Sequence, residues 1–113
     1  MMIWKKLIEH DQEALSGGML LKFRADLPFE SEVVMMICYN AGQSSEEPFS
    51  LITISGHKAG INPYVVFPAE CNVSDSSIGL SKKWLVENWN KWVWPQGSAN
   101  EVWLRSSLST TEF

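Results

Sequence analysis

The chain has 113 residues, of which 45% are hydrophobic and 19% are charged, and its net charge is −4. This length and composition predict one globular domain over residues 1–113, and they exclude a largely disordered protein. The excess of acidic charge argues against direct binding to the phosphate backbone of a nucleic acid. No apolar run is long enough for a secretory signal or a membrane span, so we expect a soluble, cytoplasmic protein without a membrane partner.

The first half of the chain is predicted to contain three strands. Residues 2–8 favour a strand, and Asp11 to Leu15 favours a helical turn. Met19 to Arg24 is predicted as a strand that follows a Gly-Gly turn. Glu32 to Asn40 gives the strongest strand signal, because its apolar run Val33–Tyr39 is typical of a central strand with both faces covered.

The middle of the chain continues the sheet. Ala41 to Pro48 is a polar turn, and Phe49 to Ser55 is predicted to pair antiparallel with the preceding strand as a hairpin. After a turn at Gly56–Gly60, Tyr64–Phe67 is bounded by two prolines, which mark strand ends or a sheet edge. Ala69 to Gly79 is polar and has the least ordered pattern in the chain.

A tryptophan-rich helix is predicted near the C-terminus. Ser81 is a good N-cap, and Leu85, Trp89 and Trp92 form an apolar stripe before Pro95 ends the helix. A short strand at Val102–Arg105 follows, and residues 106–113 are expected to be a frayed tail. The fold class is therefore α+β: a mainly antiparallel sheet of about five strands, with the helix packed on one face.

The six tryptophans have two possible roles, since buried rings build a core and exposed rings anchor partners. They lie at positions 4, 84, 89, 92, 94 and 103. The density of rings within the predicted helix favours a role in the core.

The sequence contains no recognisable catalytic, cofactor-binding or metal-binding pattern. His10, Cys38, His57 and Cys71 are scattered singly, whereas metal ligation requires closer spacing. Ser55 and His57 lie near each other, but the turn explains both, and no glycine precedes Ser55 as in a nucleophile elbow. Burial of Cys38 would suppress its thiolate. We therefore expect a protein that binds rather than catalyses, without cofactor or metal.

The excess acidic charge lies in the N-terminal part of the chain. Residues 1–47 hold eight acidic and four basic side chains, whereas residues 48–113 hold five of each. Such a surface attracts a basic partner. An alternative interpretation is that these carboxylates only keep a small domain soluble.

Four stretches of the chain resemble one protein family. They are Ile3–Asp11, Ser16–Phe23, Pro48–Ile52 and Leu80–Trp92. They are similar to the immunity protein 45 family, whose members are small bacterial proteins encoded beside polymorphic toxins, including contact-dependent growth inhibition effectors. The matching motifs are packing motifs, so no functional residue can be carried over from the family.

The resemblance implies an immunity protein that binds the C-terminal toxin domain of a sibling effector and blocks its active site or its access to substrate. Such toxins are frequently basic nucleases, often directed at tRNA, which fits the acidic charge. The candidate toxin-binding residues are Glu30, Glu32, Glu46 and Glu47, in the loops that flank the strand Val33–Tyr39. Two alternatives remain: a small ligand-binding module or enzyme with an aromatic pocket between sheet and helix, and a structural partner in a larger complex.

Overall fold

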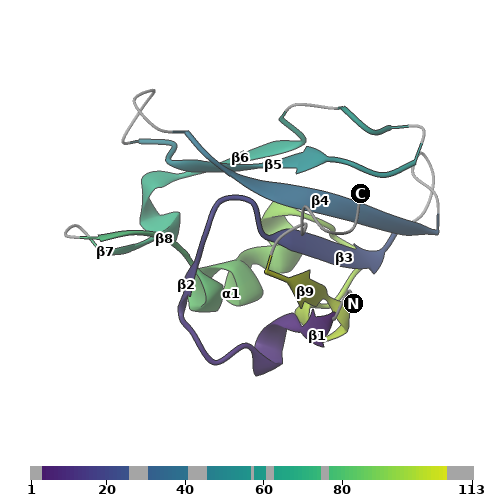
Figure 1. Cartoon of the computed structure of the whole chain (residues 1–113), viewed down its shortest axis with the longest axis horizontal. Helices are drawn as coiled ribbons and strands as arrows, with labels where there is room; N and C mark the ends of the chain where they lie inside the picture. The colour runs from purple at the N-terminus through teal and green to yellow at the C-terminus, as the bar shows by residue number, and fades with distance from the viewer. Residues whose placement is uncertain are drawn as a thin grey trace, which may run out of the picture.

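The computed structural model describes residues 4–25, 31–40, 46–56, 58–60, 63–74 and 77–106. These residues form an α+β fold with a six-stranded sheet, a three-stranded sheet and one α-helix, as the sequence predicted for the fold class (Figure 1). The strands are β1 (Lys5–Lys6), β2 (Ala14–Leu15), β3 (Leu20–Arg24), β4 (Glu32–Tyr39), β5 (Phe49–Thr53), β6 (Val65–Phe67), β7 (Asn72–Ser74), β8 (Ser77–Ser81) and β9 (Trp103–Arg105). The helices are α1 (Lys82–Trp92) and the 3-10 helices η1 (Leu7–Glu9), η2 (Ala69–Cys71) and η3 (Ala99–Glu101).

The six-stranded sheet has the order β1-β9-β3-β4-β5-β6, and every neighbouring pair is antiparallel. β4 and β5 pair as the predicted hairpin, with Tyr39 opposite Phe49. β6 forms one edge, as the two flanking prolines predicted. β9 is the last strand of the chain, yet it lies inside the sheet between β1 and β3.

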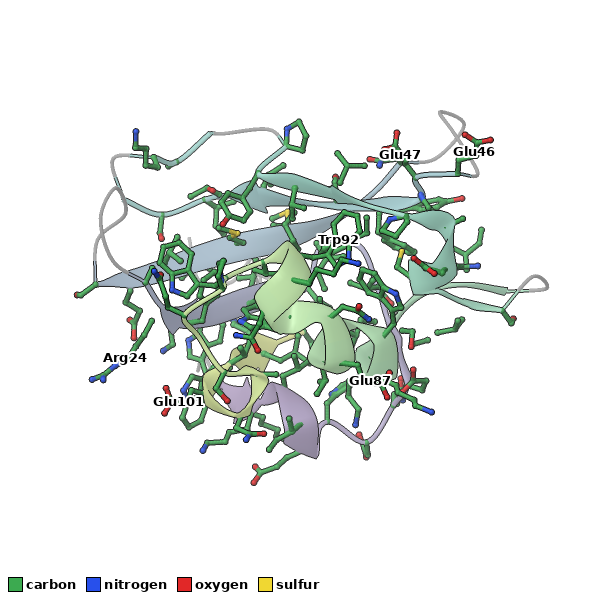
Figure 2. The ribbon with its side chains drawn as sticks, turned by 180° about the vertical axis from the view of Figure 1, so that it is seen from behind. Arg24, Glu46, Glu47, Glu87, Trp92 and Glu101 are labelled. Atoms are coloured by element: carbon green, nitrogen blue, oxygen red, sulfur yellow. The ribbon has the colours of Figure 1, made fainter. Side chains whose placement is uncertain are left out.

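β4 is central, as predicted, but only one of its faces is fully buried. Val33, Met35 and Ile37 are buried, whereas the alternating residues Val34, Met36 and Cys38 are half-buried. The sequence predicted both faces covered, whereas the second face is covered only in part. The buried side chains belong to the same core as Leu85 and Trp89 of α1, and Figure 2 shows α1 in front of this face of the sheet.

α1 begins and ends where the sequence predicted. The hydroxyl of Ser81 accepts a hydrogen bond from the backbone N–H of Trp84 at 3.1 Å, which satisfies one of the free donors of the first turn. Leu85 and Trp89 are buried, so the predicted apolar stripe faces the core. Pro95 follows shortly after the last helical residue.

The three-stranded sheet, with the order β2-β8-β7, corrects two predictions. Asp11 to Leu15 contains the strand β2 instead of a helical turn, and Ala69 to Gly79 contains η2, β7 and most of β8. The polar composition of this segment wrongly indicated little order. The Asn72 side chain instead stabilises the β7–β8 hairpin, because its oxygen accepts a hydrogen bond from the Gly79 N–H at 3.0 Å. Gly79 also permits close pairing with β2, since a Cβ there would lie 2.8 Å from the Cβ of Ala14.

The N-terminal segment is only partly a strand. β1 covers two residues and is followed by η1, whose Leu7 is fully buried and whose N–H donates to the carbonyl of Val102 at 2.8 Å. The predicted frayed tail lies outside the described residues, apart from Ser106. Within the described ranges, no helix combines the length and the apolar character needed to cross a membrane.

Candidate functional site

The predicted acidic residues lie at opposite ends of β4. Glu32 is its first residue, while Glu46 and Glu47 follow its far end and precede β5. The eight residues of β4 span about 23 Å at the usual rise of about 3.3 Å per residue. Figure 2 shows Glu46 and Glu47 well separated from Arg24, the residue paired with Glu32 in the sheet. The structure therefore forms two separate sites from these residues, and Glu30 lies outside the described residues.

Glu46 and Glu47 lie beside an exposed aromatic ring. Both carboxylates are exposed, and the Asn40 side chain donates to the backbone carbonyl of Glu47 at 2.8 Å. Tyr39, next to Asn40, is 42% exposed and packs against Phe49 with ring centroids 5.5 Å apart. The end of the β4–β5 hairpin thus combines negative charge with an exposed tyrosine, a residue type enriched at protein-binding hot spots. Sequence reasoning missed Tyr39 because it ends an otherwise apolar run.

Glu32 has a different environment, with two basic side chains and a second carboxylate nearby. It lies opposite Arg24 in the β3–β4 pairing. A hollow of about 240 Å³ is lined by Glu32, Arg24, Phe23, Lys6, Glu101 and Trp103, and we call it the charged hollow. The Lys6 ammonium lies 5.7 Å from the centroid of the Trp103 ring, within the range of a cation–π contact. Glu32 therefore shares its surroundings with basic side chains.

A second depression, of about 580 Å³, lies between the end of β3 and the end of α1. We call it the aromatic cleft, and it is lined by Phe23, Arg24, Ala25, Trp89, Trp94, Gln96, Gly97, Ser98 and Glu101. The rings of Phe23 and Trp89 meet edge to face, with centroids 5.0 Å apart. Arg24 and Glu101 lie together at its rim, on the opposite side of the molecule from the acidic hairpin end (Figure 2). This cleft lies between sheet and helix, where the sequence analysis placed an aromatic pocket.

The turn after α1 that forms one wall of the cleft is fixed by Asn90. Its side-chain amide donates to the backbone carbonyls of Trp94 at 3.1 Å and Pro95 at 3.2 Å, and also to that of Gly97. The N–H of Gly97 donates to the Trp94 carbonyl at 3.1 Å. These bonds hold the wall in place before any ligand binds. Nothing in the sequence pattern indicated this role for Asn90, because its partners lie beyond the end of the helix.

The tryptophans divide between the two roles considered from the sequence. Trp89 is 1% exposed and belongs to the core, and Trp84, Trp92 and Trp94 pack against that core while remaining partly accessible. Trp103 is 37% exposed and lies on β9. The core role therefore dominates, with one ring clearly at the surface.

The groups considered for catalysis have structural roles or lie outside the described residues. The Ser55 hydroxyl accepts from the backbone N–H of Val34 at 2.8 Å, while His57 is not among the described residues. Burial raises the pKa of the Cys38 thiol and raises that of Cys71 to about 12, so both thiols are protonated at neutral pH. Cys38 is half-buried rather than buried as predicted. Among the described residues, no three His, Cys, Asp or Glu side chains are grouped to hold a metal ion.

The chain was compared with models of known protein families. The family model for immunity protein 45 matches residues 7–104, which is most of the chain. The chain belongs to the immunity protein 45 family. The match confirms the resemblance drawn from the four stretches of sequence. No curated protein and no solved structure matches the chain.

Proposed function

We propose that this member of the immunity protein 45 family is a cytoplasmic protein that binds and neutralises the toxin domain of a sibling secreted effector, as in contact-dependent growth inhibition. Inhibition occurs by protein–protein contact that covers the active site of the toxin or its route to substrate. The observation that carries the proposal is the family match over residues 7–104. No cofactor takes part.

The proposed partner is a basic toxin domain of the nuclease class, including those that act on tRNA. The net charge of −4 supports this choice, because an acidic surface takes the place of phosphates on a basic enzyme. The proposed contact residues remain Glu30, Glu32, Glu46 and Glu47. Of these, Glu46 and Glu47 have the stronger support, since they lie beside the exposed Tyr39. Long-range attraction of this kind speeds association and adds specificity.

We propose that the protein acts by binding and performs no reaction of its own. The Ser55 hydroxyl is engaged by the backbone of β4, and both thiols are held protonated by burial. The family description, immunity protein, fits an inhibitor.

The direct test uses the effector gene that neighbours the gene for this protein. The C-terminal domain of that effector is expressed in cells with and without the chain, and cell survival is measured. We expect survival only with the chain, together with a stable complex of the two purified proteins. Toxicity that persists despite equal expression of the chain, with no complex formed, would reject the proposed function.

A ligand-binding module is the second candidate, and the aromatic cleft is the observation that favours it. Its volume of about 580 Å³ lies within the usual range for small-molecule sites. Tryptophan fluorescence across a panel of metabolites separates the two candidates, because Trp89 and Trp94 both line the cleft. A saturable response to one compound, without any toxin, would favour this second function.

A further inference from the structure

The aromatic cleft and the charged hollow are neighbours that share part of their lining. Phe23, Arg24 and Glu101 line both depressions. We call the two depressions together the groove, with Trp94 in the lining of the cleft and Trp103 in that of the hollow. Its lining combines aromatic rings, an arginine and exposed carboxylates, and tryptophan and arginine are enriched at protein-binding hot spots. An elongated site with charges of both signs suits a chain segment better than a compact metabolite.

The Trp89 side chain supplies a hydrogen-bond donor without an acceptor. Its indole Nε1 is buried, and no group in the described part of the chain accepts its hydrogen. Trp89 as a residue is 1% exposed and lines the aromatic cleft. Because buried polar groups are nearly always paired in native proteins, each exception requires an explanation. An acceptor supplied by a ligand in the cleft would explain this one.

Gly97 borders this donor, and the room between them is narrow. A Cβ placed on Gly97 would lie 3.4 Å from Nε1 of Trp89 and 3.0 Å from Cδ1 of Trp94. The position is therefore within contact distance of the donor and is bordered by the partly accessible Trp94 ring. A ligand oxygen therefore reaches Nε1 only if the Trp94 ring moves aside. Asn90 bonds the backbone of the same turn.

We propose that the groove receives a segment of the toxin, whose planar side chain enters the aromatic cleft and accepts a hydrogen bond from Nε1 of Trp89. This inference rests on the proposed function and deepens it. A tyrosine side chain has the required chemistry, because its ring packs against Phe23 and Trp94 while its hydroxyl oxygen accepts. The groove and the acidic hairpin end lie on separate parts of the surface, so the groove is a distinct contact site (Figure 2).

The first experiment follows the indole N–H signals of the ¹⁵N-labelled chain by NMR. The titrant is the C-terminal domain of the effector encoded by the neighbouring gene. We expect the Trp89 proton to move downfield at saturation, as its hydrogen bond forms. Trp84 is the internal control, because its ring packs on Phe67 of β6, with centroids 5.2 Å apart, away from the groove. A Trp89 signal that does not move at saturation would overturn the inference.

The second experiment obstructs the mouth of the groove without changing the core. Gln96 is exposed and lines the aromatic cleft, so Gln96→Arg places a long side chain at its entrance. Gln12 is also exposed but lines neither depression, so Gln12→Arg adds the same charge elsewhere and is the matched control. By calorimetry we expect Gln96→Arg to weaken toxin binding about tenfold or more, the size of a hot-spot contact, and Gln12→Arg to differ little from wild type.

The outcomes separate this inference from the proposed function. Equal affinities for wild type, Gln96→Arg and Gln12→Arg would remove the groove from the interface and leave the proposed function standing. No binding to the wild-type chain would reject the proposed function, and this inference with it. A Trp89 shift produced by a metabolite alone, or by raising the concentration of the chain itself, would assign the groove to a different occupant and overturn the inference.

Discussion

Glu46 and Glu47 place negative charge beside the exposed ring of Tyr39. This arrangement predicts that these carboxylates speed the association of a basic toxin. Reversing both carboxylates in Glu46→Lys/Glu47→Lys should lower the association rate with the neighbouring effector's toxin domain about tenfold or more at low salt. The reason is that electrostatic steering acts on the approach of the two proteins. Stopped-flow measurements at two ionic strengths test this, and the difference from wild type should shrink as salt screens the charges.

The control for this prediction changes the same total charge at another place. Glu9 and Glu87 are both exposed; Glu9 follows β1 at the sheet edge opposite β6, and Figure 2 shows Glu87 on the helix away from Glu46 and Glu47. Glu9→Lys/Glu87→Lys should therefore slow association less than the hairpin variant. Equal slowing by both variants would mean that only net charge matters. Unchanged binding of the hairpin variant at low salt would remove that loop from the interface.

Only part of the candidate site could be predicted at the level of single residues. The exposure of Glu46 and Glu47 could be predicted, because carboxylates are almost never fully buried unless they are paired. The exposure of Tyr39 could not be predicted, because an apolar run predicts burial. The ring is exposed only because it lies at the end of the hairpin. The roles of Gly97 and Asn90 depend on a turn whose shape no local pattern indicated.

The N-terminus of α1 receives a carboxylate from a distant part of the chain. Both oxygens of Glu13 accept from the backbone N–H of Lys83, at 3.2 and 3.1 Å, and the Ser81 hydroxyl donates to one of them. The first turn of α1 has no acidic residue of its own, and Lys82 and Lys83 in that turn are basic. Glu13 supplies the negative charge that favours a helix N-terminus. The sequence analysis missed this contact, because the two segments are far apart along the chain.

This arrangement predicts measurable losses of folding stability. Ser81→Ala should lower the free energy of unfolding by about 1 kcal/mol, the usual cost of losing an N-cap. Glu13→Gln should lower it by a few tenths to about 1 kcal/mol, the usual contribution of a charge at a helix terminus. Urea unfolding at pH 7 measures both. As a control, Glu9→Gln changes another exposed carboxylate and should have little effect.

The Glu13 contact also predicts a dependence on pH. The hydrogen bond from Ser81 is the main cause that holds the pKa of Glu13 below its ordinary value of 4.5. A carboxyl whose folded pKa is lowered stabilises the fold above its unfolded pKa, and this stabilisation is lost as the pH falls through the folded pKa. The difference in unfolding free energy between wild type and Glu13→Gln should therefore decrease between pH 5 and about pH 3. A constant difference over this range would contradict the assignment.

At the level of elements, strong local patterns were predictive and weak ones were not. β4, β5 and α1 were predicted within a residue or two, because their apolar patterns and caps are local signals. The β7–β8 pairing was missed because β7 is short and polar, and in β8 only Gly79 and Leu80 are buried among the described side chains, too few to produce alternation. β2 was missed because two residues are too few to show a strand pattern. They form a strand only through their pairing with β8.

At the level of the whole molecule, the strand order determines the groove, and it could not be derived from the sequence. β9 lies between β1 and β3, which places Trp103 opposite Lys6 and Lys22 and brings the preceding Glu101 to the rim shared by both depressions. These residues come from both ends of the chain. Their proximity depends on pairing over long distances in sequence, which composition and periodicity do not encode.

The same topology leads to a prediction for the whole domain. Both ends of the described chain belong to one sheet through β1 and β9, and a partner in the groove also contacts β3 and the turn after α1. A ligand that binds only the folded state stabilises it, by about 2.7 kcal/mol at a concentration 100 times its Kd. Thermal unfolding of the chain with the toxin domain of the neighbouring effector should therefore show a midpoint several degrees higher than without it. Gln96→Arg should reduce this rise and Gln12→Arg should retain it. An unchanged midpoint at saturating toxin would argue that the partner does not recognise the folded chain.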